Sequence, residues 1–247
     1  MFTLGVVMRF VLAALLVLCC AVPASAADLQ GTDLPDFLVG TASDDTVSAK
    51  AGDDVVYGLG GADRIDGGAG DDTIEGDGVC AERALVPDAC NDRDDRSGGP
   101  DVLTGGAGRD QLRGGRGNDR IDGGDDTDSI SGGSGNDSIR GDAGDDEIDG
   151  GTGLDTIFGG DGDDWIATGG GADKIDAGKG DDIVATESGS DRIDGGPGRD
   201  QIDSGGGRDR IDVRDRERDT VDCGSGTDTV IADKRDRLKH CEHVTRR

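Results

Sequence analysis

The chain has 247 residues, of which 54 are acidic and 26 basic, giving a formal net charge of -28, and only 2% are aromatic. Such an acidic chain repels phosphates, which excludes nucleic acid as a partner and favours multivalent cations. Large apolar side chains are too few to offset chain entropy by burial alone. The chain is therefore either disordered or held together by something besides an apolar core.

Residues 1–26 have the features of a signal peptide. Arg9 precedes an apolar run from Phe10 to Val22, and Ala24-Ser25-Ala26 forms a small-x-small cleavage site. The run is short for a membrane span, and no other apolar stretch occurs. We expect cleavage after Ala26, an extracellular location and no transmembrane span in the mature chain. An uncleaved N-terminal anchor is the less favoured alternative.

Nonapeptide repeats begin at Gly40, after a short segment, 27–39, that we expect to lead in and cap the first rung. Two consecutive units, Gly105 to Arg113 and Gly114 to Asp122, show glycine at positions one, two and four, aspartate at six and an aliphatic residue at eight. Four repeats occupy 40–75 and fifteen occupy 96–231, with a one-residue slip at Val213. A fixed period with invariant positions predicts a solenoid.

Each position of the repeat has its own chemistry. Positions seven to nine alternate polar, aliphatic and polar residues, which predicts a very short strand with one inward side chain. The glycines are expected to supply positive φ angles and to let backbone carbonyls point into the turn. Carboxylate and carbonyl oxygens together are the ligands that Ca²⁺ prefers. The predicted metal ligands are the position-six aspartates, Asp45, Asp54, Asp63, Asp72, Asp101, Asp110, Asp119, Asp128, Asp137, Asp146, Asp155, Asp164, Asp173, Asp182, Asp191, Asp200, Asp209, Asp219 and Asp228.

This pattern resembles the repeats-in-toxin (RTX) nonapeptide, Gly-Gly-x-Gly-x-Asp-x-aliphatic-x. The resemblance implies an all-β fold, a right-handed parallel β-roll with two repeats per rung. It also implies several Ca²⁺ ions, each between the turns of repeats n and n+2 and bound by the position-six aspartate and backbone carbonyls. The alternative, that these aspartates only solubilise turns, does not explain why Asn and Ser never replace them. Because the core is thin, we expect Ca²⁺ binding to drive folding.

An 18-residue echo supports two repeats per rung. Position five is aspartate in every second repeat of one stretch, which predicts that the two sides of the roll differ as binders. Position seven carries a cation and position nine an anion with the same spacing, which we interpret as two solvated ladders on one face. The residues are Asp145, Asp163 and Asp181 at position five, Lys174, Arg192 and Arg210 at position seven, and Asp176, Asp194 and Asp212 at position nine.

Four cysteines remain after the signal peptide, and export predicts that they form disulfides. Cys80 and Cys90 lie in an insertion, 76–95, that we interpret as a disulfide-closed surface loop, while Cys223 and Cys241 flank the end of the repeats. Three pairings are possible, and proximity in the chain favours Cys80–Cys90 and Cys223–Cys241. No Cys-x-x-Cys pair occurs, which argues against zinc.

The basic segment 232–247 is expected to cap the other end of the solenoid. Its two histidines, His240 and His243, are more simply a surface pair than metal ligands. No His-Glu-x-x-His or Gly-x-Ser-x-Gly motif occurs, and no room remains for a catalytic domain beside the repeats.

Two functions remain open. The first is a secreted calcium-binding protein, not an enzyme, with a structural or interaction role and an extracellular or cell-surface partner that the residues do not identify. This reading resembles secreted calcium-binding repeat proteins of actinobacteria. The alternative is a stand-alone or degenerate RTX-type hydrolase or toxin-related protein. The N-terminal signal argues against it, because RTX proteins commonly use an uncleaved C-terminal secretion signal.

Overall fold

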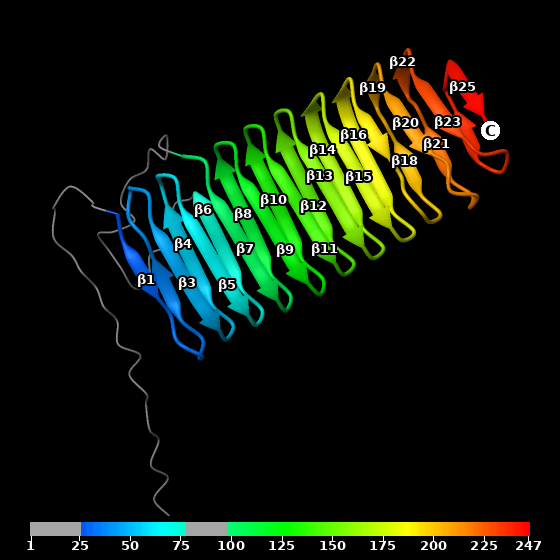
Figure 1. Ribbon diagram of the computed structural model, residues 1–247. Helices are drawn as coiled ribbons and strands as arrows, with labels where there is room; N and C mark the ends of the chain where they lie inside the picture. The colour runs from blue at the N-terminus through cyan, green and yellow to red at the C-terminus, as the bar shows by residue number, and fades with distance from the viewer. Residues whose placement is uncertain (1–25, 78–97) are drawn as a thin grey trace, which may run out of the picture.

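The computed structural model describes residues 26–77 and 98–247. All regular secondary structure in these residues is β-strand (Figure 1). The predicted signal peptide, except Ala26, and the loop that holds Cys80 and Cys90 lie outside the described residues. Within the described part of the chain, no helix has the length and apolar character to cross a membrane.

The strands form two parallel sheets. The first sheet has 12 strands: β1 (Asp28–Gln30), β3 (Thr46–Ala51), β5 (Arg64–Ala69), β7 (Val102–Ala107), β9 (Arg120–Asp125), β11 (Ser138–Ala143), β13 (Thr156–Asp161), β15 (Lys174–Lys179), β17 (Arg192–Asp194), β20 (Arg210–Val213), β23 (Thr229–Ala232) and β25 (His243–Arg246). The second sheet has 13 strands: β2 (Phe37–Val39), β4 (Val55–Leu59), β6 (Thr73–Asp77), β8 (Gln111–Arg116), β10 (Ser129–Ser134), β12 (Glu147–Thr152), β14 (Trp165–Gly171), β16 (Ile183–Gly189), β18 (Gln201–Asp203), β19 (Gly206–Gly207), β21 (Thr220–Asp222), β22 (Ser225–Gly226) and β24 (Arg237–Lys239).

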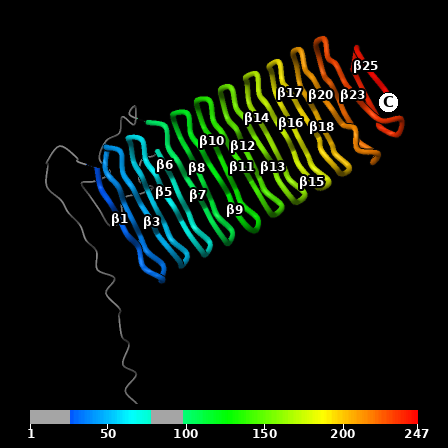
Figure 2. Tube along the Cα trace, in the orientation of Figure 1, coloured from blue at the N-terminus to red at the C-terminus, as the bar shows by residue number. Residues whose placement is uncertain are grey.

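Successive repeats alternate between the two sheets, and each strand pairs with the strand two repeats away. Ile121 of β9 therefore lies beside Ile139 of β11, which lies beside Ile157 of β13. This 18-residue register confirms the predicted parallel β-roll with two repeats per rung. The rungs stack along one direction, from the blue N-terminal strands to the red C-terminal strands (Figure 2).

The core is a double stack of position-eight side chains, one stack from each sheet. These Ile, Leu and Val residues are at most 2% exposed from Val47 to Val230, as predicted. Burial of one such side chain stabilises the fold by roughly 1.5–3 kcal/mol. Position one also faces inward and is mostly glycine. The aliphatic residue of each repeat therefore has few other apolar side chains to pack against. Hydrophobic burial therefore stabilises each rung only modestly.

The stacking register continues across both irregularities in the repeat. On either side of the insertion, Arg64 of β5 pairs with Val102 of β7, a separation of 38 residues in place of 18. At the slip, Gln201 of β18 pairs with Thr220 of β21. The described strands thus keep their register on both sides of each irregularity, because a shift in register would turn aliphatic side chains out of the core.

Both end segments extend the roll by adding strands. β1 and β2 pair with β3 and β4, and β24 and β25 pair with β21 and β23. Leu29 and Leu38 continue the aliphatic stacks at one end, and Leu238 and Val244 continue them at the other. These segments lack the full nonapeptide but keep one aliphatic residue per strand, which is what the ladder requires.

The predicted charge ladders are neighbours on the first sheet. Lys174 pairs in register with Arg192, and Arg192 with Arg210. The three aspartates two residues further on stack in the same way. Exposed pairs of this kind contribute about 0–1 kcal/mol each, so we assign the ladders to solubility.

Candidate metal centre

All nineteen position-six aspartates are buried, none more than 3% exposed. Each stands at the end of a turn, immediately before a strand, so the 18-residue register stacks them into two columns along the two edges of the roll. Buried carboxylates are rare unless a partner compensates their charge. The two columns of aspartates are therefore the candidate ligand-binding site.

One oxygen of each carboxylate has a regular partner. The backbone N–H of one aspartate donates to Oδ1 of the aspartate in the next rung. Asp119 donates to Asp137 at 2.8 Å, and Asp137 donates to Asp155 at 2.8 Å. The aspartate side chain thus ties neighbouring turns together, a role that requires a short side chain ending in an acceptor.

The second oxygen is left without a partner. In seventeen of the nineteen aspartates, Oδ2 is buried and accepts no hydrogen bond within the described structure; the exceptions are Asp45 and Asp173. At Asp45, the backbone N–H of Thr41 donates to Oδ2. An unsatisfied buried oxygen that carries charge costs several kcal/mol. A column of such oxygens requires a positive partner.

The position-one glycine lies against this second oxygen. A Cβ added to Gly132 would lie 2.5 Å from Oδ2 of Asp137 and 2.6 Å from the carbonyl oxygen of Gly150, one rung away. Gly141 has the same relation to Asp146 and Gly159, at 2.3 Å and 2.6 Å. A carboxylate oxygen and a carbonyl oxygen thus approach the same small space, and glycine leaves that space open.

This finding corrects the prediction for position one. Positive φ angles occur at positions two and four, as at Gly133 (105°) and Gly135 (135°), whereas Gly132 is not in the left-handed region. The physical reason for glycine differs between the positions. Positions two and four need an unusual backbone conformation, and position one needs room beside the carboxylate.

The electrostatic environment opposes ionisation of the column. Burial, and after it repulsion from neighbouring carboxylates, raises the pKa of Asp101 and Asp200 to about 8 against the lowering effect of the backbone hydrogen bond. The same causes raise the pKa of Asp110, Asp128 and Asp164 to about 7. A bound cation would oppose both burial and mutual repulsion.

The position-five aspartates play a different role. Asp145 accepts the backbone N–H of Asp163 at 2.8 Å, and Asp163 accepts that of Asp181 at 2.7 Å. On the other edge, Asn118 does the same for Asn136 at 2.7 Å. These exposed side chains therefore cap the N–H of the next turn on both edges.

The donor set fits a hard cation. In residues 26–77 and 98–247, no three His, Cys, Asp or Glu side chains converge on one point. A cation in the column would therefore take part of its ligands from backbone carbonyls, the mixture that Ca²⁺ accepts with six to eight oxygens. The orphaned Oδ2 atoms, the adjacent carbonyls and the absence of nitrogen or sulfur ligands are all consistent with that ion.

Sequence reasoning missed two aspartates that occupy the same register in the end rungs. Asp36 precedes β2 and aligns with Asp54, and Asp236 precedes β24 and aligns with Asp219. The signal was present, because each is followed two residues later by leucine, but the first segment keeps only the position-one glycine, Gly31, and the second keeps none. Oδ2 of Asp236 accepts the backbone N–H of Asp233 at 2.6 Å, so this end position is satisfied by the protein itself.

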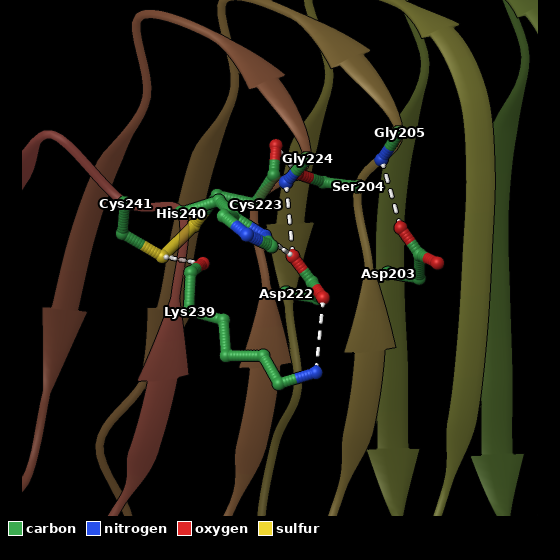
Figure 3. A network of polar contacts seen from close by, with 9 residues as sticks. All are labelled: Asp203, Ser204, Gly205, Asp222, Cys223, Gly224, Lys239, His240 and Cys241. Carbon is green, nitrogen blue, oxygen red and sulfur yellow. Dashed lines mark hydrogen bonds and ion pairs between the residues drawn. A yellow bond between two sulfur atoms is a disulfide. The ribbon is translucent and has the colours of Figure 1, made fainter.

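A disulfide joins Cys223 to Cys241, which confirms one of the predicted pairs (Figure 3). Cys223 is fully buried at position one of the last repeat, and Cys241 lies between β24 and β25. Beside it, Nδ1 of His240 lies 2.6 Å from Oδ1 of Asp222, and Nζ of Lys239 lies 3.4 Å from Oδ2 (Figure 3). The bond holds the last rung against the repeats.

We expect the double substitution Cys223→Ser and Cys241→Ser to lower the free energy of unfolding by roughly 3 kcal/mol, the value for a closed loop of this size. Urea unfolding in saturating Ca²⁺ measures the change, with Thr227→Ala, an exposed change in the same turn, as control. Equal stability of the double variant and the parent chain would show that the bond does not constrain this end.

These features define a class of protein: a parallel β-roll with columns of buried carboxylates whose oxygens fit hard cations. The family model for the RTX calcium-binding nonapeptide repeat matches residues 30–65, 49–78, 96–130, 122–157, 149–184, 158–191 and 178–211. The matches cover more than half of the chain, which therefore belongs to the RTX calcium-binding repeat family. Comparison with curated proteins found no significant match.

Proposed function

We propose that this protein is an exported scaffold whose β-roll folds when Ca²⁺ occupies its turns, and that it serves a structural or interaction role outside the cell. The observation that carries the proposal is the column of seventeen buried Oδ2 atoms without a hydrogen-bond partner. A folded state with so many uncompensated carboxylates is strongly disfavoured, and a divalent cation compensates two charges at once.

The position-six aspartates would hold the ions together with carbonyls of neighbouring turns. When bound, Ca²⁺ supplies the positive charge that cancels the repulsion between rungs. Asp137 illustrates the division of labour. Its Oδ1 accepts a backbone hydrogen bond, and its Oδ2 remains free beside the carbonyl of Gly150.

The geometry supports a binding role over a hydrolytic one. A carboxylate that acts on a substrate must reach it, and the position-six carboxylates are at most 3% exposed. The outer positions carry mixed charges that pair with their own neighbours, as Lys179 does with Asp161 at 2.6 Å. The hydrolase alternative has no observation in its favour among the described residues.

Export is supported by two independent features. The segment before Ala27 has the composition of a signal peptide. The disulfide between Cys223 and Cys241 is stable in an oxidising compartment and rare in a reducing one. Extracellular Ca²⁺ would then meet the chain only after it leaves the cell.

A circular-dichroism titration of the chain from Ala27 onwards tests the proposal. In EDTA we expect the spectrum of an expanded chain, and in millimolar Ca²⁺ that of a strand-rich fold, with Mg²⁺ much less effective because it demands a stricter geometry. The expected number of bound ions, counted by native mass spectrometry, is several per chain. Coincident spectra in EDTA and Ca²⁺ would refute Ca²⁺-dependent folding.

A matched pair of variants tests the assignment of the ligands. Asp146→Asn removes a buried position-six charge, and Asp145→Asn removes the adjacent exposed charge while keeping an acceptor for the neighbouring N–H. We expect the first to weaken Ca²⁺-dependent folding and the second to leave it nearly unchanged. Equal effects of the two changes would mean that the response reflects overall charge, not these ligands.

A further inference from the structure

A groove crosses the second sheet where four successive turns lead into β8, β10, β12 and β14, which are neighbours in the ladder (Figure 1). Its volume is about 480 Å³, within the range of small-molecule sites. One side chain from position seven of each rung lines it. In order along the ladder these are Gln111, Ser129, Glu147 and Trp165.

The hollow of the groove lies over the shortest of these side chains. Ser129 and Thr127, two residues before it, both line the groove. Longer side chains flank them, with Gln111 in the rung before and Glu147 in the rung after. Trp165 closes the end one rung further on. With rungs about 4.8 Å apart, the distance along the ladder from Ser129 to Trp165 is about 10 Å, which is the length of a small organic molecule.

Trp165 presents an aromatic ring to this groove. The side chain is 42% exposed, and it is the one tryptophan in the chain. Within residues 26–77 and 98–247, no other ring and no cation contacts the indole. An exposed, uncovered indole at the end of a groove is a platform on which a ligand can pack.

The same roll shows how an outer aromatic ring is covered by the chain itself. On the first sheet, Arg140 lies 5.1 Å and Lys174 5.5 Å from the centroid of the Phe158 ring, one from each adjacent rung. Tryptophan attracts cations more strongly than phenylalanine. The rungs beside Trp165 supply Glu147 and Ile183 instead of cations. A cation over this indole must therefore come from outside the chain.

The charge around Trp165 favours such a cation. Asp145, Glu147 and Asp163 line the groove and are exposed. The carboxylate of Glu147 makes no hydrogen bond or ion pair with another described residue. Arg109 also lines the groove, but it lies two rungs from Glu147, about 10 Å away and close to the screening length of physiological salt. The Trp165 end of the groove is thus negative, which attracts cations and repels anions.

We propose that this groove binds an organic ammonium ion, with the cation against the indole of Trp165 and its charge balanced by Glu147 and Asp163. A hydrated metal ion prefers oxygen ligands and gains little from an apolar ring. An alkylated ammonium gains from both, because its methyl groups contact the ring and its charge faces the carboxylates. The inference goes beyond the proposed function, since these three side chains lie outside the columns of position-six aspartates.

Fluorescence of Trp165 tests the proposal directly, because no other tryptophan contributes to the signal. Choline chloride is titrated into the folded chain in saturating Ca²⁺, with NaCl lowered in step so that ionic strength stays constant. We expect a saturable change in emission. The neutral isostere 3,3-dimethyl-1-butanol should give no saturable change over the same concentrations. An equal response to the neutral alcohol, or no response to choline, would overturn the proposal.

A second probe identifies the source of the ammonium group. Nα-acetyl-lysine amide carries the cation of a protein side chain, whereas choline is a free or lipid-borne quaternary ammonium. Tighter binding of the lysine derivative would assign the groove to protein partners, and tighter binding of choline would assign it to small molecules or headgroups. Both results support an ammonium site.

A matched pair of variants on β12 tests the role of the carboxylate. Glu147→Gln and Asp149→Asn each remove one exposed charge from the same strand, and Asp149 does not line the groove. We expect the first to raise the Kd for choline at least about three-fold and the second less than about 1.5-fold. Equal weakening would mean that choline responds to the overall charge of the roll, and the site would be refuted.

The aromatic ring is tested by calorimetry, because these variants lose the fluorescent group. We expect Trp165→Leu to weaken choline binding at least about five-fold and Trp165→Phe to weaken it less. Unchanged binding in Trp165→Leu would contradict the proposal. Circular dichroism of the same samples separates the two hypotheses. Coincident spectra in EDTA and Ca²⁺ would refute the proposed function, whereas a folded chain that does not bind choline would refute this inference alone.

Discussion

In EDTA, we expect the protein to be expanded at pH 8 and to become compact as the pH falls towards about 5. The cause is the raised pKa of the buried aspartates, which reaches about 8 at Asp101 and Asp200 and about 7 at Asp110, Asp128 and Asp164. Burial is the largest cause of the raised pKa in each case. Repulsion between neighbouring carboxylates is the second cause that raises the pKa. Protonation removes both penalties without a metal.

The sign follows from proton linkage. The folded chain binds protons more tightly than the unfolded chain, in which aspartate titrates near 3.8. The stability of the metal-free fold is therefore fully present below about pH 4 and is lost as the pH rises through about 6 to 8, where the folded-state groups ionise. The lowered net charge at acid pH acts in the same direction.

Saturating Ca²⁺ should reverse this dependence. Protons compete with the cation for the same carboxylates, so the Ca²⁺ concentration needed for folding should rise as the pH falls. Small-angle scattering and circular dichroism between pH 4 and 8, with EDTA and with Ca²⁺, measure both trends. A metal-free chain that stays expanded at pH 5, or one that is already compact at pH 8, would contradict the link between carboxylate burial and folding.

A single methyl group in the turn should be as disruptive as loss of a ligand. We expect Gly135→Ala to lower the free energy of unfolding in Ca²⁺ by about 3 kcal/mol or more. Gly135 has a φ of 135°, and a Cβ there would lie 1.4 Å from the carbonyl oxygen of Gly117. Because that oxygen belongs to the backbone of the neighbouring rung, it cannot move without shifting the whole ladder.

Gly170→Ala is the control at a nearby glycine where a methyl group has room. Gly170 is also a turn glycine but lies in the extended part of β14, where the nearest atom to an added Cβ is Oγ of Ser188 at 3.4 Å. Alanine in a strand is better than glycine by roughly 0.5–1 kcal/mol, so we expect no loss of stability. Chemical denaturation of both variants gives the comparison. If Gly135→Ala is tolerated as well as Gly170→Ala, the close packing between rungs is not as the structure describes it.

The repeat explains why so much of the fold could be predicted. An aliphatic residue at position eight, such as Ile148, and an aspartate at position six, such as Asp146, recur in phase, so one assignment applies to every rung. The 18-residue echo at position five also supported the two repeats per rung that the RTX resemblance implied. Periodicity turns a weak local signal into a strong one, since each copy repeats the same physical requirement.

The end strands escaped prediction because they carry only part of the signal. Asp36 and Leu38 keep the spacing of the repeat with only Gly31 of its glycines, and Asp236 and Leu238 keep it with none. Pairing with a neighbouring rung compensates for the weak local pattern. The role of position-one glycine was also misassigned. A glycine in the sequence does not reveal whether it is needed for space or for a positive φ angle. The sequence also cannot tell which oxygen of an aspartate accepts a hydrogen bond.

The amino-acid sequence by itself determined the rung, its aliphatic core position and its acidic turn, because these depend on residue type and period alone. Only the tertiary structure decided how the rungs use them. It paired Arg64 with Val102 across the insertion, left one oxygen of Asp137 free while binding the other, and linked the hydroxyl of Thr186 to the carbonyl of Ser204 in the next rung. These contacts depend on which atoms of neighbouring rungs lie within hydrogen-bonding distance of each other. The stacking of the strands fixes that distance, and the order of residues in the chain does not.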